Sequence, residues 1–400
     1  MLRSMMRASV RHDPVTALDQ WLFDHICPFW MDAIVAESGG FYEGLDAEGK
    51  TVRGNARSVL TQARLTYVFS HAYCLRPDPR LRTSAEHGFT FLCRAMDIAG
   101  NGGGWHRMIA VDGSVIDDTR DAYDHAFVIF AAAWHYRATG NSEALLLADR
   151  AYRFMQSHLT DPLYGGFFEE YPLRNGAQKL PRRQNPHMHL LEATLAMFEA
   201  TRLPQWMARG SMLVGLFKRH FIDQQNGSLI EYFNADWSPA EHSVGALREP
   251  GHHFEWVWLL HEYSRHSADQ SVIPYAERLF AFGAAYGIDR QGPLTGMVFD
   301  GVDHNGGLVA DTKLLWPQTE YIKACLARAE WMHDAQSRDW AIAHIGNMYK
   351  HFFKTDGVSW HNQLSRAGVP LQSATPARVL YHLFLAISEA IRSRSSPAPA

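Results

Sequence analysis

Apolar and polar positions along this chain repeat in one format six times. Each segment opens on small residues, usually a glycine pair, and continues with an apolar pair, a turn rich in Asp, Asn or Gly, and a second apolar stretch. Alternating apolar residues on both sides of such a turn predict a short β-hairpin. The six segments begin at Gly39, Gly103, Gly165, Gly227, Thr295 and Gly357.

The spacing of these segments predicts the fold. With positions 41, 105, 167, 229, 297 and 359 as anchors, the steps are about 64, 62, 62, 68 and 62 residues, which is typical of a repeat architecture. Between hairpins the apolar residues follow helical periodicity, as in residues 144–155 and 276–283. Two helices per interval predict an all-α (α/α)6 barrel, a toroid of six helical hairpins with short β-hairpins at one end. An open solenoid is the alternative, but the expected inner helices are apolar on all sides, which favours a closed ring.

The regular repeat also sets the domain organisation. We expect residues 13–392 to form one catalytic (α/α)6-barrel domain and residues 393–400, rich in Ser, Pro and Ala, to form a flexible tail. Hydrophobic residues make up 46% of the chain and charged residues 20%, a composition that supplies a large core and excludes a mainly disordered protein.

Charge and cysteine content narrow the expected partners. The net charge is −4 and the basic residues are scattered, so no basic stripe is present to bind nucleic acid. No window approaches 18 uncharged apolar residues, and we expect neither a membrane span nor export. The cysteines, Cys27, Cys74, Cys93 and Cys325, lack CxxC spacing, and we expect buried free thiols in a cytoplasmic protein. The sequence carries no interface signature, and a homodimer is compatible with it.

Polar side chains interrupt the apolar run at the start of each expected inner helix, about 19 to 23 residues after the anchor. If the ring closes, these positions meet at one end of the axis and line a concave site. A single buried histidine is more often a hydrogen-bonded core residue than a catalyst, but recurrence at one phase favours a functional cleft. The candidates are Gln62, Arg64, His125, His189, His252, Glu255, Trp316, Glu320, Tyr381 and His382.

An ordered set of motifs spans nearly the whole chain, from about Trp21 to Ile391. Its members are Gly39-Gly40-Phe41-Tyr42 and Gln62-Ala63-Arg64, Gly103-Gly104-Trp105 and Asp124-His125, the segments 185–193 and 250–256, Trp316-Pro317-Gln318-Thr319-Glu320, and Tyr381-His382. In this order they resemble the N-acylglucosamine 2-epimerase superfamily. The residues around His382 lack the Lys-Gly/Asn-rich pattern and the following arginine of the 2-epimerases. The chain therefore looks more like the aldose–ketose isomerase branch, which includes mannose isomerase and sulfoquinovose isomerase.

The resemblance implies an (α/α)6 barrel that moves a proton next to the anomeric carbon of a sugar without a metal or a redox cofactor. It implies that His252 and His382 are the acid/base residues and that Arg64, His189 and Glu255 bind the substrate. We expect a monosaccharide substrate, D-mannose interconverting with D-fructose through a cis-enediol intermediate. Histidine suits this chemistry because its pKa near 6.5 lets it accept and return a proton at neutral pH. The further residues expected to contact the sugar are Gln62, His125, Trp316, Glu320 and Tyr381.

Three other functions remain open from the sequence. A 2-epimerase acting on N-acylglucosamine or another aldose would use the same histidines. An (α/α)6 glycoside hydrolase would need a carboxylate pair, such as Asp124 with Glu255 or Glu320. A sugar-binding toroid without catalysis would keep the aromatic residues and need no histidine pair.

Overall fold

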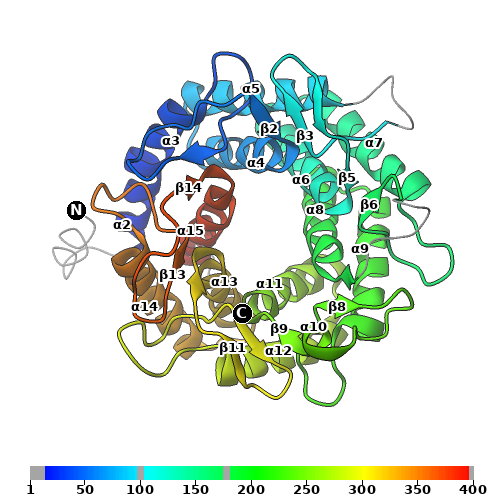
Figure 1. Ribbon diagram of the computed structural model, residues 1–400, viewed down its shortest axis with the longest axis vertical. Coiled ribbons are helices and arrows are strands. Elements are labelled where there is room, and N and C mark those ends of the chain that lie inside the picture. The colour runs from blue at the N-terminus through cyan, green and yellow to red at the C-terminus, as the bar shows by residue number, and fades with distance from the viewer. Residues whose placement is uncertain (1–13, 97–102, 174–180, 396–400) are drawn as a thin grey trace.

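The computed structural model describes residues 14–96, 103–173 and 181–395, and in them the helices form a closed double ring (Figure 1). The inner ring consists of α4 (Val59–Leu75), α6 (Ala122–Thr139), α8 (Asn185–Thr201), α11 (Pro250–Ser267), α13 (Leu315–Trp331) and α15 (Leu380–Ser395). Each inner helix packs against the next, and α15 packs against both α13 and α4. The ring is therefore closed, and the predicted (α/α)6 barrel is confirmed over the open solenoid.

The outer ring is built from helices that bury one face only. Its members are α2 (Pro14–Trp21) continuing through η2 (Leu22–Ile26) into α3 (Cys27–Ile34), α5 (Pro79–Ala95), α7 (Glu143–His158), α9 (Pro204–Leu216) continuing into η4 (Phe217–Phe221), α12 (Ile273–Tyr286) and α14 (Ala335–Phe352). Helix α7 buries a stripe at helical spacing, whereas α6 is buried at nearly every position from Ala122 to Ala133. An inner helix has neighbours on all sides, which explains its nearly unbroken apolar sequence.

Short antiparallel strands join neighbouring repeats at the end of the ring where the inner helices begin. Strands β3 (Met108–Ala110) with β4 (Val115–Asp117) and β10 (Gly301–Asp303) with β11 (Leu308–Ala310) are hairpins as predicted. The predicted turn at Asn175-Gly176 lies outside the described residues. The other strands are β1 (Gly44–Leu45), β2 (Ala56–Ser58), β5 (Arg120–Asp121), β6 (Glu170–Tyr171), β7 (Arg182–Arg183), β8 (Tyr232–Phe233), β9 (Leu247–Arg248), β12 (Lys313–Leu314), β13 (Gln363–Leu364) and β14 (Thr375–Pro376).

The strand pairs that cross between repeats were not anticipated from the sequence. They are β2–β3, β5–β6, β7–β8, β9–β10, β12–β13 and β14–β1, and the last pair closes the circle. At this seam a Cβ on Gly44 would lie 2.4 Å from the carbonyl oxygen of Thr375, so the close approach of the two strands requires glycine. The small sheets thus fasten each repeat to the next at the end of the ring that carries the hairpins.

One hydrogen bond recurs at the start of the inner helices. The backbone N–H of an anchor residue donates to a side chain in the first turns of the following inner helix, as from Trp105 to Nε2 of His125 (3.1 Å) and from Leu229 to Nε2 of His253 (2.9 Å). The same bond joins Phe41 to Gln62 and Phe167 to His187, and in the fifth repeat it joins Val298, the residue after the anchor, to Gln318. A buried amide needs such a partner, so these five side chains fix where the inner helices begin.

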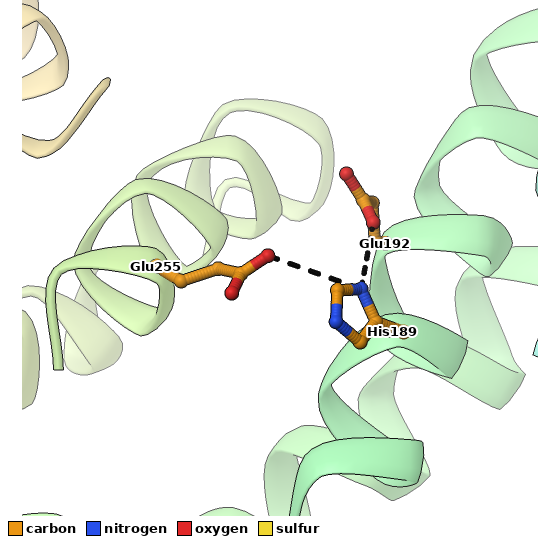
Figure 2. Close-up of side chains that lie close together, drawn as sticks. All are labelled: His189, Glu192 and Glu255. Atoms are coloured by element: carbon orange, nitrogen blue, oxygen red, sulfur yellow. Dashed lines mark hydrogen bonds and ion pairs between the residues drawn. The ribbon is translucent and has the colours of Figure 1, made fainter. Parts of the chain in front are cut away.

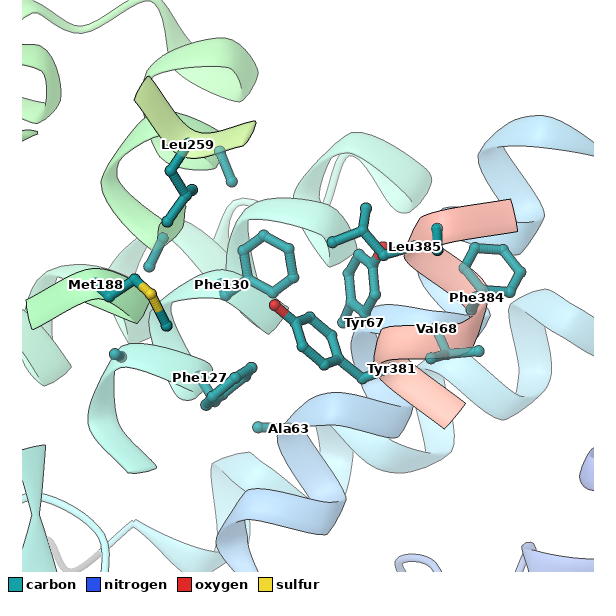
Figure 3. Close-up of a cluster of buried hydrophobic side chains, with 14 of the residues drawn as sticks. Ala63, Tyr67, Val68, Phe127, Phe130, Met188, Leu259, Tyr381, Phe384 and Leu385 are labelled. Atoms are coloured by element: carbon teal, nitrogen blue, oxygen red, sulfur yellow. The ribbon is translucent and has the colours of Figure 1, made fainter. Parts of the chain in front are cut away.

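Aromatic side chains from the inner helices fill the axis of the ring (Figure 3). The ring centroid of Tyr67 lies 4.5 Å from that of Phe130, and the Tyr381 centroid lies 5.1 Å from that of Phe127. These residues come from α4, α6 and α15, so the packing ties three inner helices together. These side chains pack the middle of the axis, and cavities lie where the inner helices begin and where they end.

Two sequence expectations need correction. Cys27 and Cys325 are buried as expected, but Cys74, in the last turn of α4, is exposed, and Cys93, near the end of α5, is only partly buried against the core. Helix α15 continues to Ser395, past residue 393 where we expected the tail to begin. Among the described helices, none has the length and apolarity that a bilayer crossing requires.

The recurring bond makes a prediction about stability. Burial lowers the pKa of both His125 and His253 to about 4, and each accepts an N–H at Nε2, so each must be neutral in the folded protein. As the pH falls from about 6.5 to 4, the unfolded chain takes up these protons first and the free energy of unfolding drops, by about 2 kcal/mol per histidine. Glutamine performs the same task at positions 62 and 318, so His125→Gln with His253→Gln should fold and lose part of this acid sensitivity.

Urea denaturation at pH 7.5 and pH 4.5 measures the effect. The exposed His304→Gln variant is the control and should keep the pH dependence of the unmodified protein. An unchanged pH dependence in the double glutamine variant would contradict the structural assignment.

Candidate active site

The axial cavity lies at the end of the ring where the inner helices begin, and its volume is about 450 Å³. A cavity of this size accommodates a monosaccharide. It is lined by Arg64, Tyr123, Arg183, Asn185, His189, Glu231, Tyr232, Glu249, His252, Glu255, Leu314, Trp316, Asn362, Gln372, Arg378, Val379 and His382. The first turns of all six inner helices contribute, so residues far apart in sequence meet as the repeat predicts.

His382 is held as a neutral imidazole. Its Nδ1 lies 2.8 Å from Oε1 of Glu320, and burial lowers its pKa to about 3 although Glu320 opposes this. Burial alone would raise the pKa of Glu320, but the charge of Lys323 and the bond to His382 hold it below its usual value. Glu320 is therefore ionised and accepts the Nδ1 proton, which leaves Nε2 as the nitrogen available to a molecule in the cavity.

His252 is in the opposite state. Its Nδ1 lies 2.9 Å from Oε2 of Glu231 and 3.5 Å from Oε2 of Glu249. Burial lowers the pKa of His252, but the two carboxylates outweigh burial and raise it to about 10. On the other ring nitrogen, the carboxamide of Asn185 lies against Nε2 (3.2 Å), and its oxygen, which has no other partner among the described residues, accepts from a protonated Nε2 once the amide is turned about its last bond. At neutral pH His252 carries a proton that it can donate.

A third group lies deeper, where His189 stands between two carboxylates (Figure 2). Its Nδ1 lies 3.1 Å from Oε2 of Glu192 and 3.8 Å from Oε1 of Glu255. Tyr381 donates from its hydroxyl to Oε1 of Glu192 (2.6 Å). Both oxygens of Glu255 lack a hydrogen-bond partner in the described structure, and burial, reinforced by Glu320, raises its pKa well above the usual value. Glu255 is thus a buried carboxyl group whose hydrogen-bonding capacity is available to a molecule in the cavity.

Arg64 is the buried cation of the cavity wall. Its Nη2 donates to the hydroxyl of Tyr123 (2.6 Å), and its guanidinium carbon lies 4.2 Å from the ring centroid of Phe127. Among the described residues no carboxylate pairs with it. The charge of Arg64 is therefore available to a negative oxygen that develops in the cavity.

Trp316 stands between the two acid/base candidates. Its ring centroid lies 4.9 Å from that of His252 and 5.8 Å from that of His382. An added Cβ on Gly251 would lie 2.6 Å from the Trp316 ring, so a glycine in the next helix makes room for the indole. The aromatic face suits the C–H face of a sugar.

Four of the ten predicted site residues lie outside the cavity lining. Gln62 and His125 hold the anchors Phe41 and Trp105 and are core residues, so their expected sugar contact is not supported by this geometry. Glu320 acts on His382, and Tyr381 acts on Glu192. Asp124, proposed for a hydrolase pair, does not line the cavity either and lies 3.7 Å from Arg107.

Sequence reasoning missed the carboxylate that sets the charge of His252. Glu231 lies in the hairpin, two residues after the anchor Leu229. An acid recurs at this offset: Glu43 follows Phe41 and bonds Ser58, and Glu169 follows Phe167 and bonds Arg183. This recurrence is a sequence signal that could have identified Glu231. Arg183, Glu249 and Arg378 also line the cavity without having been predicted.

Some of the same residues could hold a metal ion. In each of three groups, two of which share Glu255, the possible ligand atoms lie within 4.8 Å of one another. The groups are His189, Glu192 and Glu255; Glu231, Glu249 and His252; and Glu255, Glu320 and His382. Carboxylate and imidazole donors suit zinc and other first-row divalent ions, which would have to compete with the protons and hydrogen bonds described above.

Comparison with known proteins identifies the family of this chain. The sequence pattern of the family described as N-acylglucosamine 2-epimerase (GlcNAc 2-epimerase) matches residues 39–386. A protein of Rhizobium meliloti (strain 1021) named mannose-6-phosphate isomerase is 32% identical, covering 92% of this chain and 94% of its own. The D-mannose isomerase of Pseudomonas cannabina pv. alisalensis is 28% identical, covering 86% of each chain. Cellobiose 2-epimerase from Spirochaeta thermophila DSM 6192 superposes with a TM-score of 0.83 at 24% identity, covering 98% of both chains.

The family match over the barrel and the relative that aligns along nearly its full length agree with the resemblance seen in the motifs. This chain belongs to the N-acylglucosamine 2-epimerase family and is an aldose–ketose isomerase or epimerase.

Proposed function

We propose that this protein interconverts D-mannose and D-fructose by proton transfer between C2 and C1 of the open-chain sugar. The observation that carries the proposal is that two histidines with different partners line one cavity. Nδ1 of His382 faces Glu320, which Lys323 pairs, whereas Nδ1 of His252 faces Glu231 and Glu249. Arg64, which has no carboxylate partner among the described residues, lines the same cavity. An aldose–ketose isomerase needs a base for a carbon-bound proton and an acid for an oxygen.

In the forward step, Nε2 of His382 takes the C2 proton of the open-chain aldose. The C2–H electrons form the C1–C2 double bond, and O1 receives a proton from His252, which gives the cis-enediol. The proton on His382 then returns to C1 while O2–H gives its proton to His252 and the C2 carbonyl forms. Arg64 stabilises negative charge on the enediolate oxygen, while Glu255 and His189 bind hydroxyls. Every proton taken up is returned, so the step is balanced.

A second candidate is 2-epimerisation. The cavity has a histidine on either side of Trp316, and a protonated His252 could deliver a proton to the opposite face of C2 instead of to an oxygen. The product would then be the C2 epimer of the aldose. The same residues support both reactions, and the position of the sugar decides between them.

A phosphorylated aldose is a variant of the same proposal, because one relative bears the name mannose-6-phosphate isomerase. The cavity rim offers one exposed cation for a phosphate, Arg378, which has no carboxylate partner among the described residues. Arg183 is already paired with Glu169 (2.6 Å). We therefore favour the neutral sugar and include the phosphate in the test.

Proton NMR of the EDTA-treated protein with D-mannose, D-fructose, D-glucose, N-acetylmannosamine and mannose 6-phosphate in separate tubes tests the reaction. We expect fructose from mannose and mannose from fructose. Glucose formed from mannose, or the N-acetylglucosamine epimer, would instead identify an epimerase, and turnover of the phosphate alone would overturn the neutral-sugar assignment.

His382→Asn should lower kcat by about 10²–10⁴-fold, because a general base contributes that much to a proton transfer. The thermal unfolding midpoint should stay near that of the unmodified protein, and the exposed His304→Asn variant should keep full activity. Activity of the His382 variant above about a tenth of the unmodified level would exclude an essential acid/base role.

The charge of His252 gives a prediction for pH. With its pKa raised to about 10, kcat/KM should fall as the pH rises above that value and His252 loses its proton. Glu231→Gln removes the carboxylate nearest Nδ1, so the pKa of His252 should drop and the alkaline limb should move to lower pH by at least about one unit. Glu249→Gln, with its longer 3.5 Å contact, should give a smaller shift. An alkaline limb at the same pH in all three proteins would contradict the assignment of His252 as the acid.

A further inference from the structure

Lys323 is a fully buried cation that the cavity does not reach. It lies on α13 one turn after Glu320, and its Nζ forms an ion pair with Oε2 of that residue (2.6 Å). The Nζ atom also lies 4.2 Å from the ring centroid of Trp258 on α11. An ammonium removed from water this completely is costly unless it is paired, so its position demands an explanation.

The carboxylates around Lys323 are the ones that contact the cavity histidines. Burial alone would lower the pKa of Lys323, but the three carboxylates of Glu320, Glu255 and Glu192 raise it. Glu320 bonds His382, while Glu192 and Glu255 flank His189. Because Lys323 does not line the axial cavity, it cannot touch a bound sugar.

We propose that Lys323 is a positioning residue: its ion pair with Oε2 of Glu320 holds this carboxylate so that Oε1 accepts from Nδ1 of His382, which presents the lone pair of His382 Nε2 to the substrate. The proposal rests on the proposed function, in which His382 is the base. An ionised Glu320 can only accept, so Nδ1 of His382 must carry the proton of the neutral ring. A protonated Glu320 could instead donate to Nδ1, the proton of the ring would move to Nε2, and the base would be blocked.

Other titratable and charged groups also face the ion pair of Lys323 and Glu320. They come from every inner helix packed around it and are Arg64 on α4, His189 and Glu192 on α8, His252 and Glu255 on α11, and Tyr381 and His382 on α15. Of these groups, Lys323 is the cation that contacts Glu320 directly, so its removal should raise the pKa of Glu320 more than any other single change.

Lys323→Met is the first test, since methionine fills a similar volume without charge. We expect kcat/KM to fall by about 10–100-fold at pH 6, with the loss shrinking toward pH 9 as Glu320 ionises again. The acid limb of the pH profile should move upward. A loss of the same size at every pH would overturn the proposal, because a packing defect has no reason to depend on the ionisation of Glu320.

Together with Lys323→Met, the variants Glu320→Gln and Glu320→Gln/Lys323→Met complete a double-mutant cycle. The double variant removes both charges of the ion pair and so protects against a failure of the single lysine variant to fold. If Lys323 acts through Glu320, its replacement in the glutamine background should change kcat/KM by less than about twofold. A full, additive loss in that background would contradict the proposal.

Nitrogen NMR of the His382 ring gives a readout that needs no turnover, with His382→Asn used to assign its signals. The unmodified protein should show the Nδ1–H tautomer, and Lys323→Met should show Nε2–H or a mixture at pH 6. The Nδ1–H form unchanged in Lys323→Met would overturn the positioning role even if the unmodified protein failed to isomerise any sugar, whereas such a failure alone would overturn only the proposed reaction.

Discussion

The hydrogen bond from an anchor backbone N–H to a side chain at the start of the next inner helix governs the rest of the structure. This bond fixes the rotation of the inner helix about its own axis and its position along the barrel axis, because a buried amide left without an acceptor costs about 1–3 kcal/mol. Gln62, His187 and Gln318 form this bond, and the residues two positions later belong to the site. Arg64 and His189 line the cavity, and Glu320 pairs with His382. The active site is therefore a geometric consequence of how each repeat closes its own loop.

A second layer of carboxylates then gives chemically identical side chains different tasks. His252 faces Glu231 and Glu249 and keeps its proton, whereas His382 faces a carboxylate already neutralised by Lys323 and stays neutral. His253, next to His252 in sequence, is a neutral structural residue because it bonds only backbone groups. The barrel thus obtains an acid, a base and a structural support from one residue type through burial and neighbouring charge.

The sequence predicted the ring and part of the site for a physical reason. A period of about 62 residues with apolar inner helices admits few folds, and it placed Arg64, His189, His252, Glu255, Trp316 and His382 on the axis, where the structure has them. Gln62 and His125 share the same phase and polarity, so pattern alone could not separate a side chain that bonds an anchor from one that faces the cavity. Glu231 was not predicted because it lies in a hairpin, whereas the pattern of polar positions was read from the helices. The pairing of strands between repeats was not predicted because a two-residue strand is too short to show an alternating apolar pattern in the sequence.

The orientation of the sugar relative to the two histidines decides which of them acts as base and which as acid, and a crystal structure with an acyclic hexitol in the axial cavity measures it directly. We predict that C1 and C2 of the hexitol lie within about 3.5 Å of Nε2 of His382 and that O1 or O2 lies within hydrogen-bonding distance of His252. Arg64 should contact the same C1–C2 edge of the hexitol. A hexitol whose C1–C2 edge faces Glu255 or lies against His252, away from His382, would contradict the assignment of base and acid.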